Sequence, residues 1–155
     1  NGITAGVTET HFAPNRSCTR AQVLTFLWRA AGSPQPSGSE NPFTDVQEGS
    51  YYFDAVLWAV EKGITTGVTQ TAFAPDATVT RGQAVTFQYR AAGSPAVSGG
   101  AAFADVAESD YCYDAVKWAV EQGITLGTAA DTFSPGQSCL RGQIVTFLYR
   151  DLADA

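Results

Sequence analysis

Apolar residues recur at helical spacing near the end of the chain. Val116 and Val120 fall on one face of a predicted helix over 113–122. Asp114 lies in its first turn, where the helix dipole favours a negative charge. Gly123 follows as the residue type that commonly ends a helix. The pattern therefore predicts a short amphipathic helix with a defined start and end.

This pattern belongs to an internal repeat of about 60 residues. A second predicted helix, over 141–152, follows the first after a loop punctuated by glycine and proline. Each copy of the second helix opens with an arginine, and these arginines are 61 and 60 residues apart: Arg20, Arg81 and Arg141. The Gly-Ile-Thr segment that follows the first helix occurs three times, at 2–4, 63–65 and 123–125.

The repeats divide the chain into three units, which we call repeat 1 (1–36), repeat 2 (37–97) and repeat 3 (98–155). Repeat 1 begins at the glycine that ends the first helix, so it is a C-terminal half followed by two whole units. The predicted fold class is all-α, with helices joined by long loops. A unit without its first helix is expected to leave an apolar face bare, unless a partner helix covers it.

Composition and charge exclude several classes of protein. The chain has 155 residues, 45% hydrophobic and 15% charged, which is typical of a folded globular protein. A net charge of −6 argues against a general nucleic-acid or anionic-membrane surface. The first residues lack the regions of a signal peptide and the chain has no methionine, so we expect a processed or excised piece.

In the segment Thr-Arg-x-Gln at the start of the second helix, helix capping accounts for the threonine and the glutamine but not for the arginine. Thr19 and Thr80 are each followed three residues later by glutamine, which is the pattern of a capping box. Leu140 stands at the third position, so that cap is expected to be weaker. The arginine has no such role, because a helix start favours anions.

Two hypotheses explain the repeated arginine. In the first, an anion from outside binds the arginine together with free N–H groups at the helix start. In the second, the arginine pairs with a carboxylate of a neighbouring unit, such as Asp45 or Asp105. The sequence leaves both hypotheses open.

Catalytic, metal and cofactor sites have little support. His11 is the only histidine, and neither a histidine–cysteine cluster nor a phosphate-binding loop is present. We therefore predict no enzyme activity, no metal and no cofactor. Trp58 and Trp118 follow the first-turn aspartates by four residues. Such aromatic residues usually belong to the core, and stacking on a sugar face is the alternative.

The three cysteines suggest a disulfide. Cys112 and Cys139 occur together in repeat 3, whereas repeat 2 has neither cysteine at the matching positions. This paired presence predicts a Cys112–Cys139 bond and an oxidising, extracytoplasmic setting. Cys18 would then lack its partner, and three unrelated buried thiols are the alternative.

The combined landmarks resemble the S-layer homology repeat of bacterial surface proteins. They comprise Phe-x-Asp-Val, Trp-Ala, Gly-Ile, Phe-x-Pro and Thr-Arg-x-Gln, and they extend over essentially the whole chain. The resemblance implies a pseudo-threefold assembly with a central helical bundle, outer prongs and grooves between them. It also implies a non-catalytic module at the bacterial cell surface that binds secondary cell-wall polysaccharide, often through a pyruvate ketal that meets the arginine.

The sequence departs from the family pattern where the family has glutamate, because each motif here carries glutamine. Arg81 has Thr80 and Gln83 beside it and complete units around it, so we expect its site to be the best preserved. The alternative function is a structural module without a glycan ligand. The candidate ligand-binding residues are Arg20, Arg81, Arg141, Thr19, Thr80, Gln83, Asp45, Asp105, Trp58 and Trp118.

Overall fold

The computed structural model describes residues 2–4, 6–8, 10–38, 40–99 and 103–153. Their regular structure consists of helices and isolated bridges, with no strands that pair into a sheet in this part of the chain. The helices are α1 (Arg20–Ala30), α2 (Phe53–Glu61), α3 (Arg81–Ala91), α4 (Tyr113–Glu121) and α5 (Arg141–Ala153). The predicted all-α class is confirmed. None of the described helices is both long and apolar enough to cross a membrane.

Helices α2 and α4 are the matching first helices of repeats 2 and 3. Each has nine residues, with an aspartate in its first turn. Each ends before a left-handed glycine, Gly63 at φ +67° and Gly123 at φ +66°. Helix α2 packs on α1, and α4 packs on α3. Trp58 and Trp118 are buried, at 6% and 4% exposed, and the Trp118 ring contacts Tyr89 of α3.

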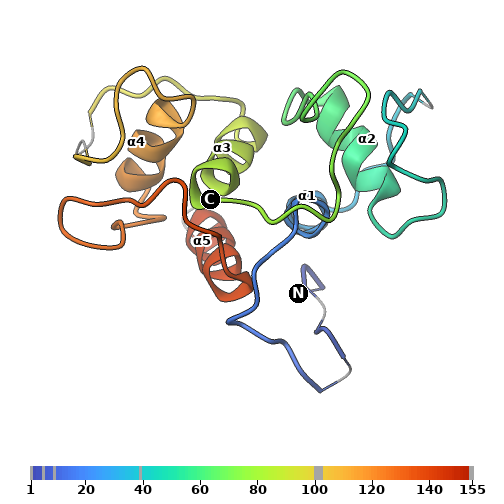
Figure 1. Ribbon diagram of the computed structural model, residues 1–155, viewed down its shortest axis with the longest axis horizontal. Coiled ribbons are helices and arrows are strands. Elements are labelled where there is room, and N and C mark those ends of the chain that lie inside the picture. The colour runs from blue at the N-terminus through green and yellow to red at the C-terminus, as the bar shows by residue number, and fades with distance from the viewer. Residues whose placement is uncertain (1, 5, 9, 39, 100–102, 154–155) are drawn as a thin grey trace.

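Helices α1, α3 and α5 form the inner part of the molecule (Figure 1). The arginine that opens each helix lies over a phenylalanine ring of the next one, in a closed cycle. The pairs are Arg20 with Phe87, Arg81 with Phe147, and Arg141 with Phe26. Each inner helix therefore contacts the other two through its arginine or its phenylalanine.

A second cycle of contacts joins the three segments that precede the inner helices. The N–H of Cys18 donates to the carbonyl of Cys139, that of Cys139 to Val79, and that of Val79 to Cys18, each at 2.9 Å. All three side chains have an exposed fraction of 0%. The matching position of every repeat thus meets the other two at one buried point.

Helices α2 and α4 flank the inner helices on two sides in Figure 1, whereas the N-terminal segment, in blue, runs below them. Repeat 1 contributes one helix, α1, to the described structure. The face of α5 that a further helix would cover includes Tyr149 and Leu152, which are 73% and 43% exposed. In the described structure, α5 therefore has large apolar side chains exposed on one side.

Candidate functional site

The three motif arginines are enclosed by the protein. Arg20, Arg81 and Arg141 are only 5%, 2% and 3% exposed. The Nε of each donates to the carbonyl of the phenylalanine in the Phe-x-Pro loop of the next repeat. The carbonyl groups are those of Phe73 at 2.9 Å, Phe133 at 2.9 Å and Phe12 at 3.0 Å. Each guanidinium also lies over the ring of that same phenylalanine.

The same loops cap the helix starts. In α1, the N–H groups of Arg20 and Ala21 donate to Ala77 and Pro75, both at 3.0 Å. The corresponding groups of α3 and α5 also donate to loop carbonyls of the following repeat, at 2.8 to 2.9 Å. The free N–H groups assumed in the first hypothesis are therefore absent at these positions. That part of the sequence prediction is wrong, because the neighbouring repeat takes the place of an anion.

Asp45 and Asp105 support these loops and do not pair with the arginines. The carboxylate of Asp45 accepts the N–H groups of Phe73 and Ala74 at 2.9 and 2.7 Å. Asp105 holds the matching loop of repeat 3 in the same way. Within the described residues, neither aspartate forms a direct ion pair with Arg20 or Arg81, but the charge of each aspartate acts on the arginine at longer range, as the second hypothesis expects.

These contacts shift the pKa of both aspartates. Burial acts to raise the pKa of Asp45, but the N–H groups of Phe73 and Ala74, together with Arg20, bring it below the ordinary value. The pKa of Asp105 is lowered against burial by the same kinds of contact. The charged carboxylates are therefore the forms that hold the loops.

Arg81 carries an unsatisfied donor. Its Nη2 is buried and has no hydrogen-bond partner among the described residues. Burial lowers the pKa of Arg81, whereas Cys139 and Asp105 act to raise it. At 2% exposed, this guanidinium reaches an external ligand only if its surroundings move.

A groove between repeats, which we call the arginine groove, places two arginines together. It has a volume of about 210 Å³ and lies between α1, the loop after α2, and α3. Arg20 and Arg90 supply its charges, and no carboxylate lines it. Thr66, Gln83 and Tyr111 add polar groups. The arrangement favours an anionic ligand with hydroxyl groups.

Tyr111 is a candidate ligand residue that the sequence reasoning missed. Its side chain is 63% exposed and lines both the arginine groove and an adjoining hollow of about 250 Å³. Gln83 also lines both spaces. By contrast, Trp58 and Trp118 are buried, which favours the core interpretation of these residues over the alternative of stacking on a sugar. Tyrosine occurs at the same position of two repeats, Tyr51 and Tyr111, and this repetition could have identified Tyr111 from the sequence.

The threonine and glutamine of the motif act as helix caps. Thr19 in α1 and Thr80 in α3 form complete capping boxes with the glutamines that follow them. In α5, Gln143 still accepts the N–H of Leu140 at 3.0 Å, but leucine supplies no oxygen in return. Of the caps, only Gln83 also lines the arginine groove.

All three cysteines carry free thiols, so the predicted Cys112–Cys139 disulfide is wrong. Cys139 lies at the central point with Cys18 and Val79, whereas Cys112 packs beside Gly82 at the start of α3. Burial raises the pKa of Cys18 to about 11 and that of Cys139 to about 12. The thiols of Cys18 and Cys139 therefore behave as small apolar core residues, and Val79 holds the matching position in repeat 2.

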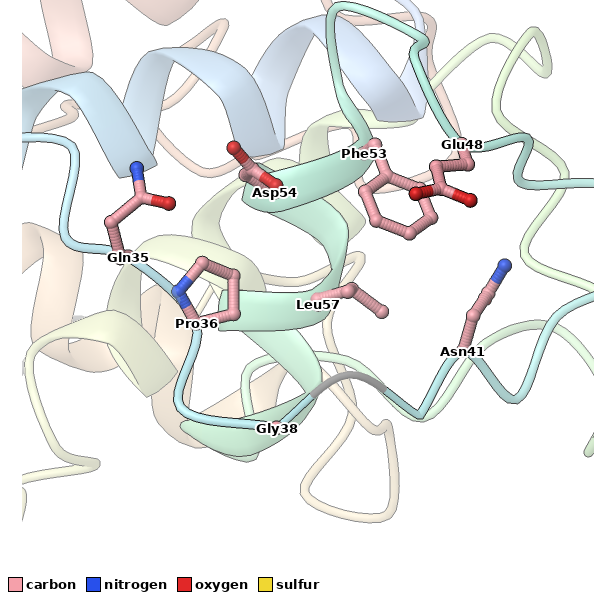
Figure 2. A pocket seen from close by; sticks show the side chains of 8 residues that line it. All are labelled: Gln35, Pro36, Gly38, Asn41, Glu48, Phe53, Asp54 and Leu57. Atoms are coloured by element: carbon pink, nitrogen blue, oxygen red, sulfur yellow. The ribbon is translucent and has the colours of Figure 1, made fainter.

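A different pocket lies against the outer side of α2 (Figure 2). It has a volume of about 450 Å³, and Glu48 and Asp54 supply its two charges. Leu57 and Pro36 form part of its apolar lining. Two carboxylates without a cation do not fit an anionic ligand. The described residues contain no group of three or more side chains suited to hold a metal ion.

Comparisons with known proteins agree with the repeat pattern. The family model for the S-layer homology domain matches residues 1–24, 42–85 and 102–145. A "Cell surface protein" of Thermoanaerobacter kivui is 32% identical over 137 residues, covering 85% of this chain and 18% of that protein.

Two enzymes are also similar to the chain. An "Endoglucanase" of Bacillus sp. (strain KSM-635) is 28% identical over 78% of this chain and 13% of the enzyme. An "Amylopullulanase" of Thermoanaerobacterium thermosulfurigenes is 27% identical over 95% of this chain and 8% of the enzyme. The chain thus spans less than a fifth of the length of each of these relatives.

Proposed function

Since the chain belongs to the S-layer homology domain family, we propose that it is a non-catalytic module that binds an acidic secondary cell-wall polysaccharide in the arginine groove. The family and the cell surface relative indicate an extracellular position at the cell surface and a role in surface anchoring. We propose in addition that the ligand is a glycan, that it binds in the arginine groove, and that the module has no catalytic activity.

The charge distribution of the arginine groove carries the proposal. Arg20 and Arg90 are its only charged lining residues, although the whole chain has a net charge of −6. An acidic polymer is therefore repelled by the protein as a whole and attracted at this groove. Such a local attraction weakens as salt increases.

A sugar carboxylate fits this groove better than a neutral sugar. Arg90 donates through Nη1 to the carbonyl of Ile64 at 3.2 Å and is only partly buried. Its remaining donors are able to meet a carboxylate such as that of a pyruvate ketal, through charge-assisted hydrogen bonds. Tyr111 offers an exposed ring to a sugar face, and Thr66 and Gln83 offer hydrogen bonds to hydroxyl groups.

The proposal favours the groove at Arg20 over the site at Arg81. At Arg20, the wall residues come from α3 and from Tyr111 of repeat 3. At Arg81, Leu126 stands in the place that Thr66 holds in the arginine groove, so one polar lining group is replaced by an apolar side chain. We therefore propose that the ligand site is the one at Arg20, whereas the sequence had favoured the site at Arg81.

The test is co-sedimentation with purified cell-wall sacculi, with and without chemical removal of the attached polysaccharide. We expect pelleting that requires the polymer. Tyr111→Ala should weaken binding about tenfold, which corresponds to about 1.4 kcal/mol. Tyr51→Ala is the matched control, because Tyr51 holds the same repeat position outside the groove and should retain binding.

A charge reversal tests the electrostatic part. Thr66→Glu places a carboxylate beside Arg20 and Arg90 and should reduce binding at least tenfold. Val68→Glu changes the net charge equally at an exposed position of the same loop that does not line the groove, and should bind normally. Equal loss in both variants, or pelleting that is independent of the polymer, would contradict the proposal.

A structural module without a glycan ligand is the second candidate. The enclosed arginines favour it, since loop carbonyls and phenylalanine rings already surround them. Under this alternative, Arg20→Ala lowers the free energy of unfolding and Tyr111→Ala changes nothing. Loss of polymer binding by Tyr111→Ala at unchanged melting temperature would exclude it.

We also propose that a partner helix completes repeat 1. The bare face of α5 supports this part of the proposal. It stands independently of the glycan, because it concerns a different surface from the arginine groove.

A further inference from the structure

The pocket on the outer side of α2, which we call the α2 pocket, is separate from the arginine groove. It has a volume of about 450 Å³, within the range of about 300–1,000 Å³ that is typical of small-molecule sites. The two spaces share no lining residue. The lining of the α2 pocket includes Gln35, Asn41, Glu48, Phe53, Asp54 and Leu57.

The α2 pocket holds two carboxylates without a cation. Among the described residues that line it, only Glu48 and Asp54 are charged. No described residue donates a hydrogen bond to either carboxylate or forms an ion pair with it. The pocket therefore favours a positively charged ligand.

The other walls of the α2 pocket offer an aromatic ring and two amides. Phe53 and Leu57 lie one turn apart on α2 and both line the pocket (Figure 2). Asn41 is held in place, because its Nδ2 donates to a backbone carbonyl at 2.6 Å and its Oδ1 accepts a backbone N–H at 3.0 Å. Gln35 is exposed and supplies the second amide. An aromatic ring attracts an ammonium group, and amides bind hydroxyl groups.

Repeat 3 shows which group lies over the matching ring. Tyr113 of α4 matches Phe53, and Lys117 matches Leu57. The Nζ of Lys117 lies 5.3 Å from the centroid of the Tyr113 ring. Repeat 3 therefore places its own ammonium group over the ring, whereas the leucine of repeat 2 has no such group to offer.

The acidic positions are the same in both repeats. Glu108 and Asp114 stand in repeat 3 where Glu48 and Asp54 stand in repeat 2. The lysine adds a positive charge beside this pair in repeat 3 only. The α2 pocket thus keeps the carboxylates and the ring of this arrangement but lacks its ammonium group.

We propose that the α2 pocket binds an amino sugar whose nitrogen carries no acetyl group. Its ammonium group lies over the Phe53 ring, as the Nζ of Lys117 lies over Tyr113, and offsets the two carboxylates. Gln35 and Asn41 bind its hydroxyl groups. An acetylated nitrogen is neutral and leaves the carboxylates uncompensated. A lysine side chain carries the same ammonium group but has no hydroxyl groups for the two amides.

The test is an NMR titration of the full chain, in which amide shifts of α2 report binding. The probes are D-glucosamine, N-acetyl-D-glucosamine and a lysine amide with a blocked α-nitrogen. The pH is mildly acidic, so that the amines carry a proton and the carboxylates are ionised. We expect glucosamine to bind with a Kd of about 1–10 mM, as suits a ligand of one sugar. Each of the other two probes should bind at least tenfold more weakly.

Two variants test the position of the ligand. Glu48→Gln should weaken glucosamine binding at least tenfold, because it removes one of the two carboxylates. Glu108→Gln is the matched control, since it makes the same change at the same position of repeat 3 and should bind normally.

A lysine placed in repeat 2 tests the comparison with repeat 3. Leu57→Lys should abolish glucosamine binding, because it supplies the ammonium group from the chain itself. Gln70→Lys adds the same charge at an exposed position outside the pocket and should retain binding. Melting curves establish that each variant is folded.

Three outcomes would overturn the proposal. The first is the absence of glucosamine-dependent shifts in α2. The second is binding of N-acetylglucosamine or of the lysine amide as tight as that of glucosamine. The third is an equal loss in Glu48→Gln and Glu108→Gln. None of the probes carries a free carboxylate, so these outcomes are independent of the acidic polysaccharide proposed for the arginine groove.

Discussion

Helices α3 and α5 have nearly the same sequence pattern and nearly the same inner contacts, yet their outer faces differ. On the inner side, Arg81 and Arg141 are both buried, and each donates to a phenylalanine carbonyl of the next repeat. On the outer side, Tyr89 packs against Trp118, whereas Tyr149 is 73% exposed. Which apolar residues of α3 and α5 are buried therefore depends on the helix packed beside them, and not on their own sequence pattern.

The largest expected effect is at the paired valines of the two helices. Val85→Ser should lower the free energy of unfolding by about 2–3 kcal/mol, because it removes buried methyl groups and buries a hydroxyl. Val145→Ser should cost less than about 1 kcal/mol, since Val145 is half-buried. Urea unfolding of both variants measures the difference. Equal losses would mean that the face of α5 is covered in solution.

The second-largest effect on stability is expected for the loop that packs over the start of α3. Asp105→Ala removes the acceptor of the N–H groups of Phe133 and Ser134, at an expected cost of about 1–2 kcal/mol. The folded pKa of Asp105 lies below its unfolded value of about 3.9. Its contribution is therefore complete above about pH 4 and is lost as the pH falls through the folded pKa.

Acid unfolding curves of Asp105→Ala and of the unchanged protein measure how much Asp105 contributes to the pH dependence of stability. Asp105→Ala should narrow the gap in stability between pH 6 and pH 3 relative to the unchanged protein. An unchanged acid dependence would show that the carboxylate does not hold the loop.

The helix caps provide a smaller contrast between α3 and α5. Thr80→Ala should cost about 1 kcal/mol, because it removes the side-chain oxygen that caps α3. Leu140→Thr should stabilise the protein by about 0.5 kcal/mol, since Gln143 is already in place for a complete capping box. Thermal unfolding monitored by circular dichroism tests both. A loss on Leu140→Thr would mean that the apolar contacts of leucine outweigh the missing cap.

The smallest expected effect is at Tyr149. Tyr149→Ser should change the free energy of unfolding by less than about 0.5 kcal/mol, because the ring is mostly exposed. Tyr89→Ser, its counterpart in α3, should cost clearly more, since the ring contacts Trp118 and its hydroxyl donates to the carbonyl of Pro95 at 3.0 Å. Similar small losses in both would weaken the comparison.

The sequence predicted the elements well and the site only in part. The helix predicted over 113–122 is α4, Tyr113–Glu121, and the helix predicted over 141–152 is α5, Arg141–Ala153. Local signals suffice for such elements, because caps and apolar spacing act within a few residues. The partners of the arginines lie more than 50 residues away in sequence, so no local pattern identified the carbonyls of Phe73 and Phe133.

The cysteines illustrate the same limit. Paired presence within repeat 3 suggested a bond between Cys112 and Cys139, whereas Cys139 has its close contacts with Cys18 and Val79 of the other repeats. Spacing within one unit carries no information on contacts between units. The error therefore came from treating a repeat as a structural unit closed on itself.

The helical class, the repeats of about 60 residues, the caps at Thr19 and Thr80, and the family could all be predicted from the amino-acid sequence. The enclosure of the arginines, the position of Tyr111 at the groove and the exposed apolar side chains of α5 depend on how the helices pack, and could not be predicted. The physical reason is that burial and charge compensation are properties of neighbours. In this protein, the groups that enclose the arginine of each repeat belong to the following repeat.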